Sequence, residues 1–410
     1  MDRAALSDFK RLISARFFFT LAVQMQVVVV GWRVYDLTKD PLSLGLMGLA
    51  EAVPALSLAL YAGYIVDRTP PLKAYRWVLK GSLFSVFILL ASALLQNHTD
   101  HATQVAALYV ASFFTGAARA FSQPAMFAIV PRLLKRESLA QAQALMGSTM
   151  QVARVAGPAL GGLAFGFLGL TPSFLIICAY LFASLISSYL IKAKIEASPS
   201  IRPARTMRED LVEGASFVFR HPILLPALTL DMVSVLFGGV TALLPIFAQE
   251  ILNVGPHGLG ALRAAPALGA AVMGLYLAKV PLRHRAGPWL FSAVAGFGLS
   301  ILVFAASKNF ILSLVALVMS GVFDSVSVIV RGTAVQLASP DYMRGRISAV
   351  NSMFIGSSNE LGAFESGLAA KLMGVVPSAY FGGLICLATV GVIAIVSPTL
   401  RKLDLDKVTA

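Results

Sequence analysis

The sequence predicts an all-α membrane protein with twelve transmembrane helices arranged in two pseudo-symmetric six-helix bundles. Apolar residues make up 57% of the chain and charged residues only 13%, and the mean hydropathy is +0.79, which excludes an ordinary soluble enzyme. Apolar runs of about twenty residues, the length that crosses ~30 Å of hydrocarbon, recur along the whole chain. A polar stretch near the middle separates six of these runs from six others.

Each predicted helix is one of these apolar runs. The first six are expected near residues 15–37, 42–66, 75–95, 104–129, 139–164 and 168–192. Six more are expected near 224–250, 256–280, 287–306, 309–332, 345–371 and 374–397. The predicted domains are therefore an N-terminal bundle over 1–192, a linker over 193–222, a C-terminal bundle over 223–397 and a tail over 398–410. The charged run before Phe217 predicts an amphipathic surface helix within the linker.

Net charge decides the expected orientation. The chain carries a formal charge of +13, which in a soluble protein would suggest a nucleic-acid partner. Among the lysines and arginines not assigned to the membrane, however, only Lys39, Lys308 and Lys371 fall on the side opposite the N-terminus. Because basic loops stay in the cytoplasm, both termini are expected there, and the basic excess is explained without nucleic acid.

The two halves show weak internal similarity. Glu51-Ala-Val-Pro54 aligns with Arg263-Ala-Ala-Pro266, so the second and eighth predicted helices each carry one charge, of opposite sign. A second alignment pairs Gly147 and Ser148 with Gly356 and Ser357. Duplicated halves are typical of secondary transporters, which place the substrate site near the middle of the bilayer.

Three stretches resemble the major facilitator superfamily over nearly the whole chain. The loop Gly63-x-x-x-Asp67-Arg68, with Lys73 beyond it, resembles the superfamily signature between helices two and three, although Pro70-Pro71-Leu72 replaces its small and basic residues. The run VVVVGWRVYDLTKDPLSLGLMGLAEAVPAL resembles the drug-proton antiporter branch that includes enterobactin exporters and macrolide efflux proteins.

The third stretch is Arg154-x-x-Gly157-Pro158-x-x-Gly161-Gly162, which is similar to a motif of proton-driven antiporters that export their substrates. Its glycines allow another helix to approach closely, and Pro158 bends its own helix. The resemblance implies a central cavity and outward transport of an amphipathic small molecule. It also implies a monomer in a bacterial inner membrane.

Buried acids are the expected proton-coupling residues, because a carboxyl at bilayer depth is costly when charged and can bind a proton reversibly. The candidates are Glu51, Asp231, Asp324, Glu360 and Glu365.

For Glu51 the alternative is a fixed ion pair with an arginine. Asp231 is either a proton site or a partner of Arg263 or Arg331. Asp324 lies seven residues before Arg331, two helical turns away, so a direct bond between them is not expected. Glu360 and Glu365 point in different directions, so at most one is expected at the central site.

Polar residues inside the predicted helices are the expected substrate contacts. They are Gln24, Arg119, Gln123, Arg263 and Asn359. Arg119 and Gln123 lie one turn apart and suit an anionic substrate group. The alternative for Arg119 is a structural one, in which it locks the fourth helix to an acid such as Glu51.

The function expected from these residues is secondary active export by proton-coupled alternating access. The chain has no GxxxxGK[ST] phosphate loop and no nucleophile with an orienting base, so ATP hydrolysis and catalysis are not expected. The histidines lack metal-ligand spacing, so neither a metal nor another cofactor is expected. Coupling to sodium in place of protons stays open. The alternatives are a lipid or lysophospholipid flippase and a non-transporting receptor or scaffold.

Overall fold

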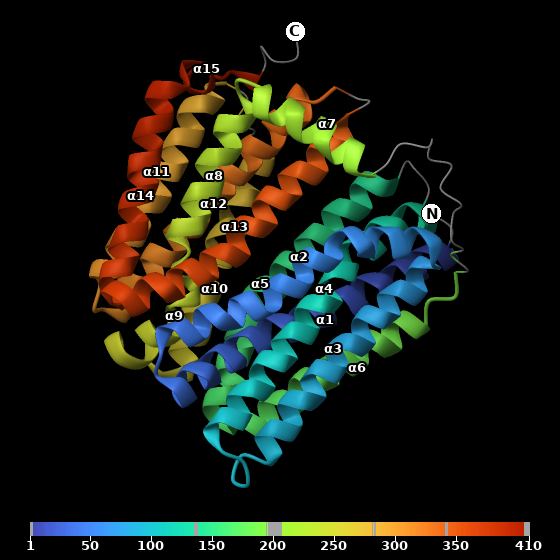
Figure 1. Cartoon of the computed structure of the whole chain (residues 1–410). Coiled ribbons are helices and arrows are strands. Elements are labelled where there is room, and N and C mark those ends of the chain that lie inside the picture. The colour runs from blue at the N-terminus through green and yellow to red at the C-terminus, as the bar shows by residue number, and fades with distance from the viewer. Residues whose placement is uncertain are drawn as a thin grey trace. The chain divides into compact units, whose positions relative to one another are not determined.

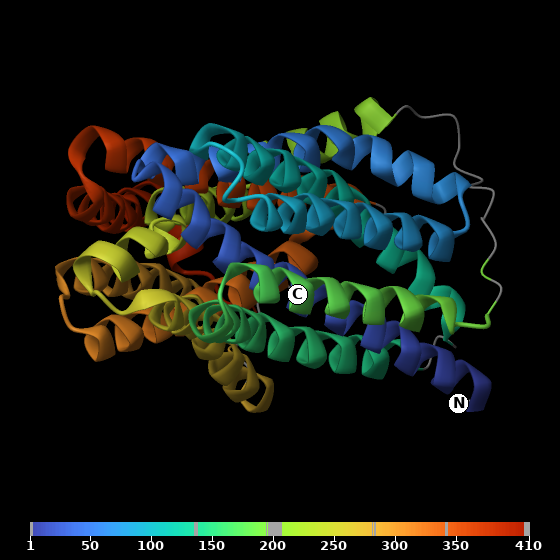
Figure 2. The same ribbon diagram turned by 90° about the horizontal axis from the view of Figure 1, so that it is seen from below.

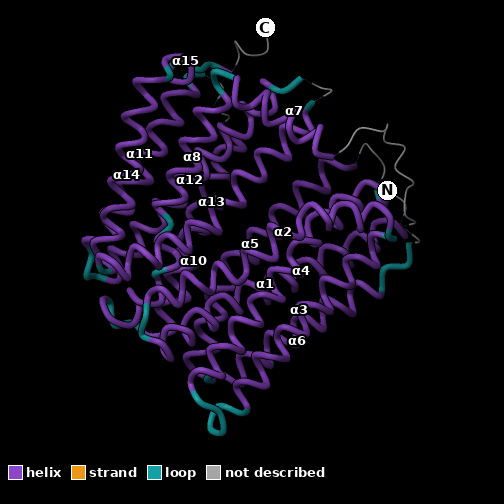
Figure 3. Tube along the Cα trace, viewed as in Figure 1, coloured by secondary structure: helices purple, strands orange, loops and turns teal. Residues whose placement is uncertain are grey.

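The computed structural model describes residues 3–134, 138–193, 195, 207–280, 282, 284–340 and 343–405. Within these ranges the regular secondary structure is helical (Figures 1 and 3). This confirms the all-α class. This class follows from the apolar composition. In lipid every backbone polar group needs a partner within the protein, and a helix supplies these partners within its own segment.

The first six helices pack against one another. They are α1 (Arg3–Thr38), α2 (Pro41–Arg68), α3 (Pro71–Leu94), α4 (His101–Leu133), α5 (Leu139–Leu168) and α6 (Leu170–Tyr189). Helix α4 lies between α2 and α3, while α1 contacts α5 and α6, and α3 also contacts α6. Figure 2 shows these helices running alongside one another.

The remaining elements begin with the linker helix α7 (Met207–Arg220), which the charged run before Phe217 predicts. The seventh predicted span is broken into α8 (Leu224–Gly238), a 3-10 turn η2 (Val240–Ala242), α9 (Leu244–Ile246) and a π-helical turn η3 (Phe247–Ile251). The others are α10 (Gly255–Lys279), α11 (Ala286–Ala306), α12 (Phe310–Ala338), α13 (Arg344–Met373), α14 (Val375–Val396) and α15 (Pro398–Arg401).

Each of the twelve predicted spans coincides with a long helix or, for the seventh, with this broken run. Ten of them, in the described residues, are long and apolar enough to cross a membrane. Helices α5 and α13 have 30 residues each and are therefore long enough, but they carry more polar residues. Their composition indicates that their polar faces lie against protein or water, because charged groups facing lipid are costly.

The hairpin after α2 is tighter than the sequence predicts. Helix α2 continues through Arg68, and only Thr69 and Pro70 separate it from α3, which begins at Pro71. Proline is well tolerated in the first turn of a helix, because the backbone N–H groups of that turn have no hydrogen-bond acceptor within the helix. The prolines therefore shorten the loop, and the basic residues of this region lie within helices.

The chain divides into two compact units. The first comprises Met1–Ile201 and Pro245–Ala264, and the second comprises Arg202–Leu244 and Ala265–Ala410. The segment Pro245–Ala264, which the sequence places in the C-terminal bundle, thus packs with the first six helices. Its two ends coincide with helix irregularities, since η2 lies just before Pro245 and Pro266 lies inside α10 just after Ala264.

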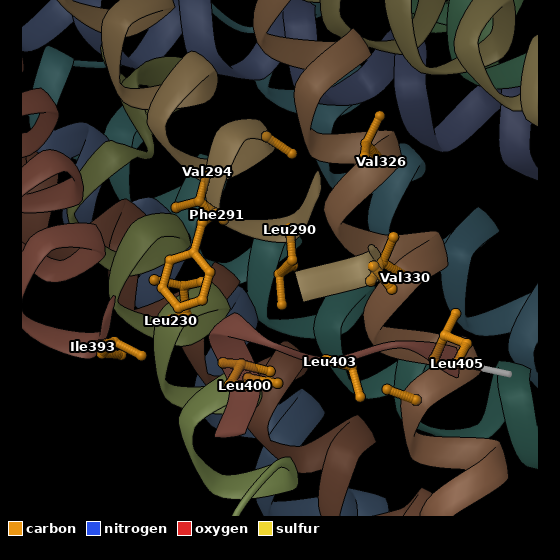
Figure 4. Packing of buried hydrophobic residues seen from close by; sticks show 14 of the residues in the cluster. Leu230, Leu290, Phe291, Val294, Val326, Val330, Ile393, Leu400, Leu403 and Leu405 are labelled. Carbon is orange, nitrogen blue, oxygen red and sulfur yellow. The ribbon is translucent and has the colours of Figure 1, made fainter. Parts of the chain in front are cut away.

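The second unit has an apolar core between α8, α11 and α12, which the short helix α15 and the residues after it close at one end. Figure 4 shows Leu230, Leu290, Val294 and Val330 within this cluster, with Leu400 packed against it. Each of these side chains is at most 3% exposed. The cluster includes side chains of α8 and α12, the helices that carry Asp231 and Arg331.

Candidate functional site

Glu51 on α2 and Arg119 on α4 form an ion pair inside the first unit. The two helices approach closely because Gly116 faces the backbone of Glu51, where a Cβ at position 116 would lie 2.0 Å from the Glu51 carbonyl oxygen. The Glu51 side chain is 15% exposed and that of Arg119 is 41% exposed. The structure therefore favours the paired arrangement for both residues, and the Arg119 side chain is the more exposed of the two.

Arg263 is a second basic group near Glu51. It lies on the part of α10 that belongs to the first unit, and its charge interacts with the Glu51 carboxylate. Its Nε atom is buried and has no hydrogen-bond partner in the described part of the chain. Two basic side chains, Arg119 and Arg263, thus lie near the Glu51 carboxylate.

The glycines of α5 form the contact surface that their spacing predicts for a close helix approach. A Cβ at Gly157 would lie 2.5 Å from the Gln24 Cβ atom on α1, and one at Gly161 would lie 3.0 Å from the Met25 backbone. Gly162 faces α10, where a Cβ would lie 2.7 Å from Gly260 Cα. The motif therefore packs α5 between α1 and the N-terminal part of α10.

The other polar candidates of the first unit occupy different places. Gln24 is half-buried beside Gly157, whereas Gln123 accepts a hydrogen bond of 3.2 Å from Arg16. Arg154 is exposed on α5, and its charge interacts with that of Arg16. Arg119 and Gln123 thus have different partners. The structure does not join them into one binding group.

A buried polar network links α1, α3 and α4 and was not expected from the sequence. Gln26 donates to the Thr115 hydroxyl at 3.0 Å, and that hydroxyl lies 2.9 Å from Ser85 Oγ. All three side chains are at most 5% exposed. Of the two glutamines on α1, Gln26 is therefore structural, and Gln24 is the more accessible.

The second unit contains an enclosed ion pair between Asp231 on α8 and Arg331 on α12. Their side chains are 5% and 4% exposed. Of the partners open to Asp231, the structure selects Arg331 and leaves Arg263 in the other unit. As the spacing predicts, Asp324 has no direct bond to Arg331, and within the described residues it forms no hydrogen bond or ion pair of its own.

The acids of α13 are less connected. Asn359 is exposed and donates to the Ile355 carbonyl at 2.8 Å, which satisfies its amide within its own helix. Glu365 is half-buried beside Ser366, whose hydroxyl donates to the Gly239 carbonyl at 3.3 Å. The side chain of Glu360 lies outside the described part of the structure.

Only part of the superfamily signature between α2 and α3 lies within the described residues. Arg68 stacks over the Tyr64 ring at 4.0 Å and donates to its hydroxyl, and the Lys73 amino group lies 5.6 Å from the Trp77 ring centre. The surroundings of Gly63 and the side chain of Asp67 lie outside the described residues. The basic groups of this motif thus rest on aromatic rings of their own helices.

Residues 12–363 match the sequence model of the Major Facilitator Superfamily. The chain belongs to this superfamily. It is therefore a membrane transporter and not an enzyme, and the resemblance carried by the three motifs is confirmed. The charged residues at membrane depth described above are thus parts of a major facilitator transporter.

Curated relatives cover almost the whole chain. It is 25% identical over 376 residues to the enterobactin exporter EntS of Shigella boydii serotype 18, covering 92% of this chain and 88% of that protein. The same figures hold for the enterobactin exporter EntS of Escherichia coli O1:K1. These relatives are bacterial exporters of the same superfamily.

Solved structures share the fold. A POT family transporter in complex with 5-aminolevulinic acid superposes with a TM-score of 0.78 at 13% identity, covering 96% of each chain. A bacterial homologue of the iron transporter ferroportin in an inward-facing state gives a TM-score of 0.73 at 17% identity, covering 97% of this chain and 99% of that one. At these identities the similarity establishes the major facilitator fold alone.

Proposed function

We propose that this protein exports an amphipathic small molecule, drug-like or siderophore-like, by proton-coupled alternating access. The observation that carries the proposal is the ion pair between Glu51 and Arg119, because it lies at membrane depth and stays accessible. Its arginine is 41% exposed, whereas the Asp231 and Arg331 pair is enclosed on both sides. Buried charges that a ligand can reach mark substrate and ion pathways in membrane proteins. The similarity to enterobactin exporters supports the outward direction.

The pair offers a simple basis for exchange. In antiport, the transporter does not carry the proton and the substrate in the same direction in one step. Competition between proton and substrate for a single carboxylate meets this requirement. A proton on Glu51 removes the charge that holds Arg119. A hydroxyl or amine of the substrate, donating to the ionised Glu51, takes the place of the proton. Each unit charge that crosses 100 mV contributes ~2.3 kcal/mol, so one proton can drive about a fiftyfold gradient of a neutral substrate.

Contacts of the segment Pro245–Ala264 support the alternating-access part of the proposal. Tyr35 donates a hydrogen bond to Glu250, and the Lys39 amino group donates to the Gln249 side chain at 3.0 Å. We propose that these contacts, together with the close approach of Gly162 and Gly260, form in one state of the cycle and separate in the other. The remaining acid candidates, Glu360 and Glu365, would then have secondary roles.

The test uses proteoliposomes with a pH-sensitive dye inside. Adding a catecholate siderophore or a macrolide should move protons in the wild type, and Glu51→Gln should abolish this flux while the protein still folds. Asp36→Asn is the matched control, because Asp36 also pairs with basic residues but is 43% exposed at the end of α1. Full proton flux in Glu51→Gln would remove Glu51 from the mechanism. Movement of a labelled lysophospholipid, with no flux of either probe, would favour the flippase alternative.

The proposed setting is the inner membrane of a bacterium, with both termini in the cytoplasm and the protein acting as a monomer. A reporter that fluoresces only in the cytoplasm, fused in turn to each terminus, tests the orientation. Fluorescence from both fusions is expected, and a dark fusion at either end contradicts it.

A further inference from the structure

A small cavity lies inside the second unit, between α8, α11 and α12. Its polar lining consists of Asp231, Ser234, Asp324 and Ser327, and Phe297 and Phe323 contribute to the apolar wall. The cavity leaves a volume of about 10 Å³ for the centre of a water molecule. It can therefore hold about one water molecule. The apolar cluster of Figure 4, including Val294 and Val326, packs around the same three helices.

Helical spacing explains why these groups meet. Asp231 and Ser234 lie three residues apart on α8 and therefore share a face. On α12, Asp324, Ser327 and Arg331 recur at spacings of three and four and share a face in the same way. Two polar stripes thus face each other across the cavity.

The polar lining offers mainly oxygen lone pairs. Ser234 Oγ donates its proton to the Leu230 carbonyl at 2.6 Å, so toward the cavity it can only accept. The two carboxylates, when ionised, are also acceptors only. Ser327 is 4% exposed, and its Oγ has no hydrogen-bond partner among the described residues. Burying such a hydroxyl without a partner is costly, which indicates that the cavity holds a ligand for it.

The charges of this cluster do not balance. Asp231 and Asp324 contribute two negative charges and Arg331 one positive charge, which leaves one negative charge at a cavity where Asp231 is buried and Asp324 is half-buried. An uncompensated buried charge is strongly unfavourable. A single monovalent cation corrects the imbalance, as does a proton on one of the two carboxylates, whereas a neutral water molecule does not.

We propose that this cavity binds one sodium ion through Asp324, Asp231, Ser234 and Ser327. Hard cations prefer oxygen ligands of this kind. A dehydrated sodium ion is smaller than a water molecule and fits the available space, whereas a dehydrated potassium ion is about as large as that molecule and leaves no room to spare. The site rests on the second unit alone. It is separate from the Glu51 pair, and it does not depend on which substrate is exported.

Thermal unfolding of the purified protein tests the site without any transport substrate. Sodium chloride replaces choline chloride at constant ionic strength, and the midpoint temperature is followed by tryptophan fluorescence. Because a ligand that binds the folded state stabilises it, the midpoint should rise with sodium and saturate. Potassium should give a much smaller rise. Ser327→Ala should require a sodium concentration roughly tenfold higher for half the effect, because one ligand is lost.

Ser320→Ala is the matched control. Ser320 lies on the same helix and is 3% exposed, but its hydroxyl donates to the Leu317 carbonyl and does not line the cavity. It should keep the sodium response of the wild type. An equal response to sodium, potassium and choline, or an unchanged response in both Ser327→Ala and Asp324→Asn, would overturn the site. Substrate-driven proton flux in sodium-free vesicles tests the Glu51 proposal separately, so the two can fail independently.

Discussion

Arg331 on α12 donates a hydrogen bond to Asp231 on α8, one hundred residues earlier in the chain, and both side chains are enclosed in protein. Removing Asp231 leaves the buried Arg331 without its hydrogen-bonded partner, because Asp324 forms no direct bond to Arg331. Asp231→Ala should therefore lower the free energy of unfolding by ~3–5 kcal/mol, measured by chemical denaturation in detergent.

The double variant tests the pairing itself. Asp231→Ala combined with Arg331→Ala should lose clearly less stability than the sum of the single variants, because the pair is removed together. Asp36→Ala is the control, since its exposed ion pairs should contribute at most ~1 kcal/mol. Additive losses for Asp231 and Arg331 would show that the pair does not hold α8 to α12.

The close approach of α2 and α4 depends on Gly116. A Cβ there would lie 2.0 Å from a carbonyl oxygen, and backbone cannot move aside as a flexible side chain can. Gly116→Ala should cost ~1–3 kcal/mol by overpacking. Gly147→Ala on α5 is the control, because nothing lies within 4 Å of the added methyl group, and it should stabilise its helix by ~0.5–1 kcal/mol. Thermal midpoints of the two variants should move in opposite directions.

His221 connects α7 to α8 and is predicted to make stability depend on pH. Its Nδ1 atom accepts from the backbone N–H groups of Ile223 and Leu224, at 3.2 and 3.3 Å, which requires a neutral ring. Burial lowers the pKa of His221 below its usual value near 6.5. The contribution, ~1 kcal/mol, is therefore fully present above that value and is lost as the pH falls through the lowered pKa.

Two variants separate the cap from the titration. His221→Asn keeps an acceptor oxygen without a titrating ring, so its stability should change less than that of the wild type between neutral and mildly acidic pH. His221→Ala should be less stable at neutral pH and equally insensitive. Equal acid sensitivity in all three proteins would assign the effect to groups other than His221.

The hydrogen bond from Tyr35 to Glu250 provides a test of alternating access. Cysteines at both positions, Tyr35→Cys and Glu250→Cys, joined by a short cleavable maleimide linker, should stop export, and cleavage should restore it. The native cysteines, Cys178 and Cys386, are buried and should contribute little background. The two single cysteine variants, treated with the same reagent, are the controls, because neither can form the link. Full export with the 35–250 linker in place would show that these contacts need not separate.

Hydropathy places most of the long helices, because lipid imposes a single length and a single solution for the backbone, although α5 and α13 are more polar than the other ten. Hydropathy does not determine which faces of the helices pack against each other. From the sequence, Asp231 could pair with either of two arginines, and only the packing of α8 against α12 selects Arg331. Ser327 gives no signal in the sequence at all, since a serine in a membrane helix usually bonds its own backbone, as Ser320 does.

The breaks around Pro245–Ala264 have a mechanical consequence. A regular helix resists bending along its whole length, whereas a missing hydrogen bond concentrates bending at a single place. The turn at Val240–Ala242 and the proline at 266 are two such places, and they fall next to the two ends of the segment that belongs to the first unit. Bending of the chain is thus concentrated in a few backbone torsions at these two joints, so the segment between them can shift without bending the regular helices on either side.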